Sequence, residues 1–204
     1  MSHLPLTLAN ALAKGIVVAF DLEFTSWEGA VSRHWTGAGE RREVVEIGAV
    51  KLDAAQSFRE LAALRVLVRP LLNPLLSDYF TGLTRITQRE VDQNGLSFSE
   101  ALKAFATFVE AADAIVCWGS DAMVLAENCG IHRISFPISE LKFHSVRSQV
   151  CEAFDLPYAT ASGELPDLLG LRRTGEKHDA ISDARAVGDA LALTISASKG
   201  RTKF

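Results

Sequence analysis

The chain has 204 residues, of which 48% are hydrophobic and 23% charged, a composition typical of one folded domain with a substantial core. No apolar run approaches the roughly 20 residues that cross a bilayer, so a membrane span is not expected. A formal net charge of −4 argues against a surface coated in positive charge for binding duplex nucleic acid. That argument weakens if four carboxylates belong to one metal-binding cluster, because the remaining charges then balance.

The N-terminal segment and the cysteines indicate the compartment. Residues 1–15 contain a short apolar stretch with no basic segment before it, which favours a short turn of helix over a cleaved signal peptide. Cys117, Cys129 and Cys151 are odd in number and lack CxxC or zinc-ligand spacing. We therefore expect buried thiols in a cytoplasmic protein.

Three strands are predicted near the start of the chain. Residues 15–24 form a near-continuous apolar run with β-branched side chains, the pattern of a central strand buried on both faces. Residues 44–53 and 61–70 predict a second and a third strand, and Pro70 ends the third. Because no helical segment separates these strands, we expect them to form a meander.

Capping signals predict helices in the middle of the chain. Thr87–Glu90 and Ser97–Glu100 both match the capping box, in which Ser or Thr is followed three residues later by Glu. Residues 114–121 predict a fourth strand that turns at Gly119 into a helix. Asp121 is therefore expected at a strand-to-helix corner.

The C-terminal third completes the predicted fold. Residues 134–139 predict a short fifth strand, residues 140–154 a helix, and residues 179–195 a last helix with one apolar face. Strands that alternate with helices predict an α/β fold, here a single domain over residues 1–204 with its core at about 16–195. Its sheet is expected to be mixed and five-stranded, with helices flanking it.

Acidic side chains gather where predicted strands and helices meet. Asp21 and Glu23 lie two residues apart at the end of the first strand, so their side chains point to the same face. Like charges held close would raise each other's pKa and destabilise the fold unless a cation occupies the gap. A strand end that surfaces into solvent is the simpler interpretation of two acids alone. Asp121, His178 and Asp183 favour the cation, because ligands of open α/β sheets bind near carboxyl strand ends.

The last helix restricts how His178 and Asp183 can act together. Asp183 comes early in this helix, beside its apolar stripe, so its side chain is expected to lean toward the sheet. The two residues are five apart and would diverge on a continuous helix. Both therefore serve one site only if His178 lies in the preceding loop, where Gly175 is a pivot.

Five segments of the chain resemble, in order, the motifs of the DEDDh 3′-to-5′ exonucleases, the DnaQ-like group of the ribonuclease H-like fold. The similarity covers roughly residues 16–195, and within the group it looks most like the RNA-trimming branch of the histone-mRNA exonuclease type. The segments are FDLEFT, EVVEIGAVKLD, LTRITQREVD, CWGSDAMVL and HDAISDARAVGDAL.

The resemblance implies a ribonuclease H-like fold and a metal-dependent hydrolase that removes nucleotides from the 3′ end of single-stranded nucleic acid, with RNA favoured over DNA. It assigns two Mg²⁺ or Mn²⁺ ions, roughly 3.5–4 Å apart, to the acidic site. The metal-site acids would be Asp21, Glu23, Asp121 and Asp183, and the general base would be His178.

Two positions depart from the family pattern. Only Ser120 separates the Trp-Gly pair from Asp121, where the branch commonly has two residues. Arg85 stands where the Leu-Thr-Gly-Ile segment of the family has glycine, near the expected substrate groove.

Trp118 is expected to anchor the strand end beneath Asp121 rather than to stack a base.

The resemblance also implies contacts with the substrate. Phe24, Thr25, Leu83, Thr84 and Arg85 lie where the family packs its terminal nucleotide by stacking and hydrogen bonds. Ordinary core packing and helix capping explain these positions too, and for Phe24 and Leu83 the two interpretations weigh equally.

Two segments near the site each allow two interpretations. Arg172, Arg173 and Lys177 either draw phosphate toward His178 or belong to a solvated basic loop. The insertion at residues 26–43 is either a lid over the substrate or a surface loop.

Two other functions compete with a free-standing exonuclease. A nuclease-like scaffold that no longer cuts would be expected to have lost an acid or the histidine, and all five are present in the sequence. A proofreading subunit would act only beside a polymerase, with weak activity alone and an exposed apolar partner surface.

Overall fold

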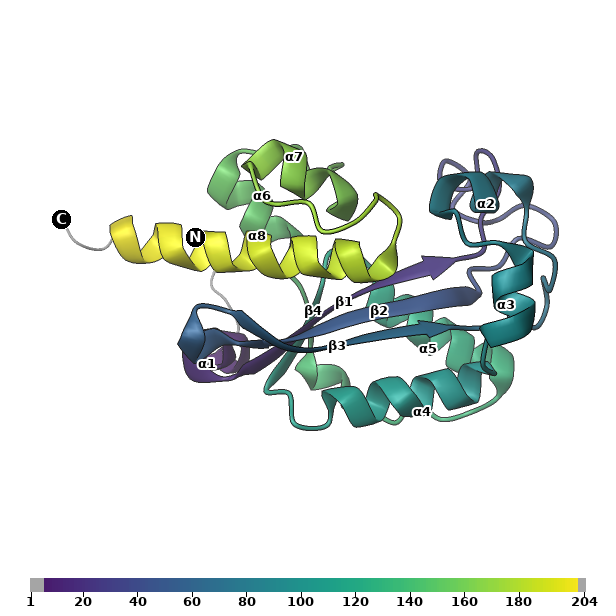
Figure 1. The fold of residues 1–204 in the computed structure, drawn as a ribbon, viewed down its shortest axis with the longest axis horizontal. Helices are drawn as coiled ribbons and strands as arrows, with labels where there is room; N and C mark the ends of the chain where they lie inside the picture. The colour runs from purple at the N-terminus through teal and green to yellow at the C-terminus, as the bar shows by residue number, and fades with distance from the viewer. Residues whose placement is uncertain (1–5, 202–204) are drawn as a thin grey trace.

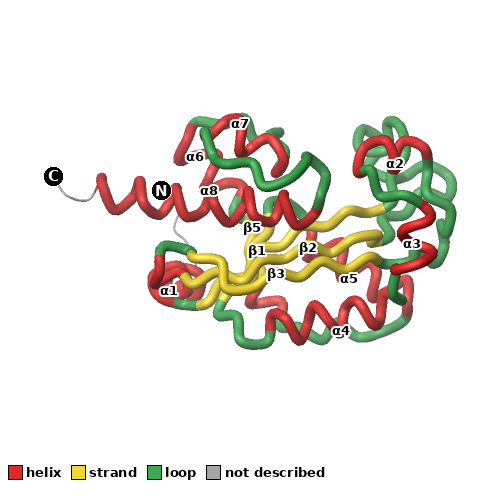
Figure 2. The backbone as a smooth tube through the Cα atoms, viewed as in Figure 1, coloured by secondary structure: helices red, strands yellow, loops and turns green. Residues whose placement is uncertain are grey.

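The computed structural model describes residues 6–201 and is built on one five-stranded sheet in the order β3-β2-β1-β4-β5 (Figures 1 and 2). β1 pairs antiparallel with β2, and β2 antiparallel with β3, while β1, β4 and β5 run parallel. The predicted α/β class, mixed sheet and three-strand meander are therefore confirmed. The strands are β1 (Ile16–Phe24), β2 (Val44–Asp53), β3 (Arg59–Leu67), β4 (Ala114–Cys117) and β5 (Phe143–Ser145).

Helices cover both faces of the sheet (Figure 1). α8 lies across one face with α6 and α7 packed beside it, and α4 and α5 cover the other face. Among residues 6–201, no helix is both long and apolar enough to cross a bilayer. The helices are α1 (Leu6–Lys14), α2 (Asp78–Thr84), α3 (Gln88–Asn94), α4 (Phe98–Val109), α5 (Asp121–His132), α6 (Arg147–Phe154), α7 (Leu165–Leu169) and α8 (Ala180–Arg201).

Side chains alternate along β1 between two hydrophobic cores. Val17 and Ala19 belong to the core under α1 and α8, whereas Val18 and Phe20 belong to the core under α4 and α5. Asp21 and Glu23 continue the first series, so the two-residue period of the strand turns both toward the α8 face.

The two predicted capping boxes are present. Thr87 accepts a hydrogen bond from the Glu90 amide and Ser97 from the Glu100 amide, and each glutamate bonds back to its capping residue. These reciprocal bonds satisfy amides that the first turns of α3 and α4 leave without a partner.

The predicted fifth strand and the helix after it were wrong in part. Residues 134–139 form a loop that contains Pro137 and packs its apolar side chains against the sheet. β5 forms instead inside the segment predicted as a helix, where Phe143 pairs with Ile115 of β4. The open edge of β4 supplies hydrogen bonds that local sequence preference does not reveal. α2 and α7 are short helices that no sequence pattern predicted.

Gly48 allows α8 to approach the sheet. It pairs with Asp21 across β1 and β2, and the first turn of α8 lies directly over it. A Cβ atom at this position would lie 2.2 Å from the carbonyl carbon of Ala180 and 2.3 Å from the amide nitrogen of Ile181. Backbone atoms cannot yield as a flexible side chain does, so only glycine fits here without a shift of the helix.

We predict that Gly48→Ala lowers the free energy of unfolding by about 1–3 kcal/mol, because the added methyl pushes α8 off the sheet. Urea denaturation measures the change. Gly130→Ala is the matched control, since a Cβ at this exposed position of α5 has no neighbour within 4 Å. The control should be neutral or stabilising by up to about 1 kcal/mol. Equal stability of the two variants would show that α8 does not press on β2.

Candidate active site

Five predicted residues from distant parts of the chain line one cavity of about 250 Å³. The side chains of Asp21 and Glu23 come from the C-terminal half of β1, and Asp121 begins α5 just after β4. Asp183 lies in the first turn of α8, and His178 lies in the loop before it, as the spacing required. All four acids are buried, with exposed fractions between 3% and 8%.

Two of the acids and His178 lie close enough to one another to share a cation. Glu23, His178 and Asp183 each offer a ligand atom within 4.8 Å of those of the other two. Ser162 lies between two carboxylates, and its hydroxyl oxygen is 3.3 Å from Oδ1 of Asp21 and 3.3 Å from Oδ2 of Asp183. The single hydroxyl proton can satisfy only one of them at a time.

Gly163 and Gly119 shape the backbone around the acids. A Cβ on Gly163 would come within 3.1 Å of Oδ1 of Asp183, so glycine lets the 162–164 turn close over this carboxylate. The amide of Gly119 donates to Oδ2 of Asp121 at 3.2 Å. Asp121 is thus oriented into the cavity despite the single residue between it and the Trp-Gly pair.

Burial and mutual repulsion perturb the acids. Burial raises the pKa of Asp21 well above its ordinary value, and the charges of Asp121, Asp183 and Glu23 raise it further. The pKa of Glu23 is raised by burial and then by Asp183. Burial raises the pKa of Asp183 to about 6, although the Ser162 hydroxyl opposes this shift. The cluster therefore binds protons, or cations, more tightly than separate carboxylates would.

The donor set fits a hard divalent cation. Carboxylate oxygens dominate it, and these are the ligands that Mg²⁺ and Mn²⁺ prefer. In the described part of the chain, no Lys or Arg forms an ion pair with any of the four acids. Arg147 and Arg173 act on Asp121 and Asp183 only from beyond ion-pair distance. Because no direct ion pair compensates the acids, a bound cation would stabilise the site.

His178 is held neutral at the edge of the acids. Burial lowers its pKa, and the positive charges of Lys177 and Arg85 lower it further. Its backbone is left-handed, with φ of 61°, which turns the chain sharply into α8. A neutral imidazole can accept a proton, so His178 has the ionisation state of a general base.

The basic loop before His178 is tied down by acidic partners. Arg173 and Lys177 both pair with Asp167, at 2.8 Å and 3.3 Å. Arg85 pairs with Glu176 at 3.3 Å and occupies the left-handed C-cap of α2, with φ of 65°. That conformation favours glycine, so it accounts for the glycine of the family pattern at this position, and Arg85 adopts it without that advantage.

The predicted substrate contacts divide into two groups. Phe24 and Leu83 line the cavity. Thr25 instead donates to the carbonyl of Arg41 and accepts from the amide of Glu43. Thr84 likewise bonds within the protein and caps the end of α2, so the hydroxyl groups of both threonines have partners within the fold.

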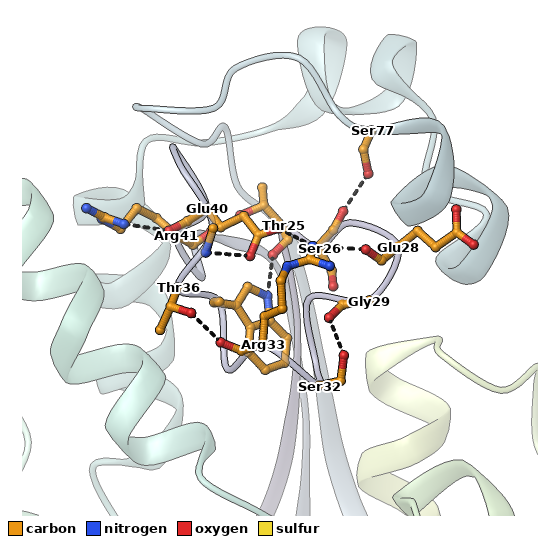
Figure 3. A network of polar contacts seen from close by, with 12 residues as sticks. Thr25, Ser26, Glu28, Gly29, Ser32, Arg33, Thr36, Glu40, Arg41 and Ser77 are labelled. Atoms are coloured by element: carbon orange, nitrogen blue, oxygen red, sulfur yellow. Dashed lines mark hydrogen bonds and ion pairs between the residues drawn. The ribbon is translucent and has the colours of Figure 1, made fainter.

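The insertion at residues 26–43 lines the cavity with Ser26, Val31 and Trp35. A network of polar contacts holds it in place (Figure 3). Trp35 donates from Nε1 to the carbonyl of Thr25. Its ring packs edge to face against the ring of Phe24, with 5.5 Å between the ring centroids. An ion pair between Arg33 and Glu40 closes the loop on itself, as the sticks show. Together with α2, this loop gives the cavity an apolar wall, formed by Phe24, Val31, Trp35, Tyr79 and Leu83.

Glu46 is a buried residue that sequence reasoning missed. Its side chain is fully buried opposite Glu23, and Oε2 accepts from the amide of Ala180, the first residue of α8. Oε1 accepts from Arg65 at 2.6 Å. A carboxylate at a helix N-terminus satisfies a free amide and interacts favourably with the helix dipole. Glu46 therefore anchors the helix that carries Asp183.

The raised pKa of Asp183 predicts how stability depends on pH. A carboxyl with a higher pKa in the folded state stabilises the fold when protonated, and this contribution is lost as pH rises through the folded value. For Asp183 the window runs from 3.8 to about 6. Metal-free Asp183→Asn should thus exceed the wild type in unfolding free energy by up to about 3 kcal/mol near pH 7.5, and the advantage should shrink toward pH 5.

Thermal melting with and without Mn²⁺ checks this prediction. Millimolar Mn²⁺ should raise the melting temperature of the wild type near neutral pH and have a smaller effect on Asp183→Asn, because the cation binds the folded acids. If the difference in stability between the two metal-free proteins did not change with pH, the raised pKa of Asp183 would be contradicted.

Comparisons with known proteins agree with this geometry. The exonuclease family RNase_T matches residues 18–191, while no curated protein sequence matches the chain. The nuclease domain of 3'hExo, a DEDDh family member bound to rAMP, has a TM-score of 0.76 and 22% identity, over 90% of this chain and 92% of that one.

Two further structures share the fold at lower identity. A 3′-exonuclease that recognises the histone mRNA stem-loop has a TM-score of 0.75 and 20% identity, over 90% of this chain and 82% of that one. E. coli Exonuclease I in complex with a dT13 oligonucleotide has a TM-score of 0.68 and 13% identity, over 92% of this chain and 42% of that one. The chain therefore belongs to the RNase_T exonuclease family and has the ribonuclease H-like fold of the DEDDh enzymes.

Proposed function

We propose that this protein removes nucleotides from the 3′ end of single-stranded nucleic acid, with two Mg²⁺ or Mn²⁺ ions and His178 as general base. The observation that carries the proposal is the meeting of four buried acids and a neutral histidine in one cavity with an apolar wall. A single catalytic domain would suffice for this reaction. We also infer a cytoplasmic location, which the free, buried cysteines support.

The acids would hold the ions in separate roles. Asp21 would contribute to both ions, with Glu23 and Asp183 completing one site and Asp121 holding the second. When bound, the ions activate a water for attack and stabilise the charge that develops on the leaving 3′-oxygen. The protein orients the carboxylates in advance through Ser162, Gly119 and the anchoring of α8.

His178 would take the proton of the attacking water at an imidazole nitrogen. Its lowered pKa keeps the ring neutral near pH 7, so proton transfer needs no prior deprotonation. The ion pair of Arg85 with Glu176 would hold the loop that carries the imidazole. Arg85 would thus act on the loop and, because its side chain is exposed, would also be available to the strand.

The apolar wall would bind the terminal nucleoside. Aromatic rings stack bases without regard to sequence, which suits an enzyme that trims successive nucleotides. Phe24 and Leu83 would form this surface with Trp35 and Tyr79, so the insertion would act as a fixed wall rather than a surface loop. RNA is favoured over DNA by the resemblance to the RNA-trimming branch and by the rAMP and histone mRNA complexes of the similar structures.

The assembled site favours an enzyme over a silent scaffold. A scaffold has no need to keep four repelling carboxylates buried together, because any one replacement would relieve the repulsion. For a proofreading subunit, the same activity would require a polymerase.

The direct test is a 5′-labelled single-stranded oligonucleotide incubated with Mn²⁺ and then with a chelator. We expect a ladder that shortens from the 3′ end with Mn²⁺ only, and faster for RNA than for DNA of the same sequence. Gel electrophoresis measures the products. Failure to shorten either strand would support the scaffold, and activity that appears only with a polymerase present would support the proofreading subunit.

Single replacements test the assigned roles. Asp183→Asn should lower the rate at least about 100-fold, because it removes a charge required in the transition state. His178→Ala should lower the rate by about 10²–10⁴-fold and keep metal binding, because only the base is lost. Initial rates and Mn²⁺ titration calorimetry measure the two effects.

Asp92→Asn is the matched control. This exposed acid of α3 carries the same charge, and asparagine can still accept its bond from Gln88. The control should retain the wild-type rate. Wild-type activity of Asp183→Asn would refute the site, and loss of Mn²⁺ binding in His178→Ala would make His178 a ligand.

A further inference from the structure

Arg147 is a cation in the active-site cavity that the proposed chemistry does not use. It begins α6, directly after β5, and lines the cavity with the four acids. Within residues 6–201 it takes part in no ion pair, and its Nε is buried without a hydrogen-bond partner there. Asp121 acts on Arg147 only from beyond ion-pair distance. An arginine without a directly bonded anion in a partly buried site points to an anion supplied by the ligand.

Two aromatic rings hold the guanidinium in place. Its central carbon lies 5.6 Å from the ring centroid of Trp118 and 5.4 Å from that of Tyr158. The Trp118 ring is itself fixed, because it is buried and donates from Nε1 to the carbonyl of Thr160 at 2.7 Å. Stacking occupies the faces of a guanidinium and leaves the N–H groups at its edge free for planar recognition of phosphate.

Gly119 keeps room between Arg147 and Asp121. Nη2 of Arg147 lies 3.2 Å from the point where a Cβ on Gly119 would stand, and Oδ2 of Asp121 lies 3.7 Å from the same point. The cation is thus beside the acidic cluster but not bonded to it. If metal ions neutralise Asp121, no negative charge at this edge of the cavity offsets the positive charge of the guanidinium.

The sheet order separates Arg147 from the apolar wall. The wall comes from the last residue of β1, the connection after it and α2, whereas Arg147 follows β5, beyond β4 in the sheet. The acids of β1 and Asp121 lie between them. A strand whose last nucleoside rests on the apolar wall, with its scissile phosphate at the acids, therefore brings its next phosphate toward Arg147.

We propose that Arg147 binds the phosphate immediately 5′ of the scissile phosphodiester and so sets the path of the strand into the site. This inference rests on the proposed function for the identity of the strand. Arg147 is here a binding residue, distinct from the groups that carry out hydrolysis. It makes a strand with at least two phosphodiesters a better ligand than a dinucleotide.

The test combines a protein change with a ligand change. One 5′-fluorescein oligonucleotide carries a neutral methylphosphonate at the second linkage from the 3′ end. The control is an unmodified 5′-fluorescein oligonucleotide of the same sequence. Wild type and Arg147→Met are titrated with both strands in Ca²⁺ by fluorescence anisotropy, and strand length is checked afterwards on a gel. This readout needs no turnover.

We expect each single change to weaken binding by about 10- to 100-fold, the range for one charge-assisted contact. Together they should weaken it no further, because both remove the same contact. The slope of log affinity against log salt should fall by about 0.7 in Arg147→Met on the unmodified strand. Losses that multiply, or a methylphosphonate without effect on the wild type, would overturn the proposal.

Two further variants separate binding from folding. Arg147→Lys keeps the charge but not the stacked plane, and it should retain part of the affinity for the unmodified strand. Lys103→Met removes an exposed cation from α4, on the other face of the sheet (Figure 1), and should behave as the wild type. A wild type that binds both strands with this pattern but never shortens them would refute the proposed hydrolysis and leave the role of Arg147 intact.

Discussion

Mutual repulsion among four buried carboxylates is the constraint on which this molecule is organised. Asp21, Glu23, Asp121 and Asp183 would separate if the chain allowed it. Burial raises the pKa of all four, and the charges of the other acids raise the pKa of Asp21 and Glu23 further. The packing of α8 on the sheet opposes the separation. Its apolar residues Ala184, Ala186, Val187, Ala190 and Leu191 are all buried in one core with Val17 and Ala19 of β1. Hydrophobic burial therefore supplies the free energy that holds the acids together.

The start of α8 links this packing to the chemistry. Gly48 removes the side chain that would keep the helix away, and Glu46 binds the first helical amide. Asp183 then follows within one turn, and His178 precedes the helix in a left-handed turn. A shift of α8 would move both residues at once, so the stability of this contact and the geometry of the site are not independent.

The elements that place the acids were predictable because each rests on local geometry. The period of two along a strand puts Asp21 and Glu23 on one face, and the turn after β4 puts Asp121 at a helix start. Contacts between distant segments were not predictable. Ser162 and Arg147 enter the cavity from loops and helices whose path depends on tertiary packing, and neither has a local sequence signal. β5 was misplaced for the same reason, since its pairing with β4 outweighs the helical pattern around it.

Glu43 holds together the two segments of the chain that carry most of the apolar wall. This carboxylate is fully buried and accepts from the backbone amides of Leu71, Leu72 and Asn73 and from the Asn73 side chain. It thereby ties the segment before α2 to the end of the insertion, and Ser77 adds a second tie to Ser26. The backbone of these segments therefore loses its rotational freedom when the chain folds, before any ligand binds. Under the proposed function, an incoming base would meet a preorganised surface, so the entropy lost on association would fall mainly on the flexible strand and little on the protein.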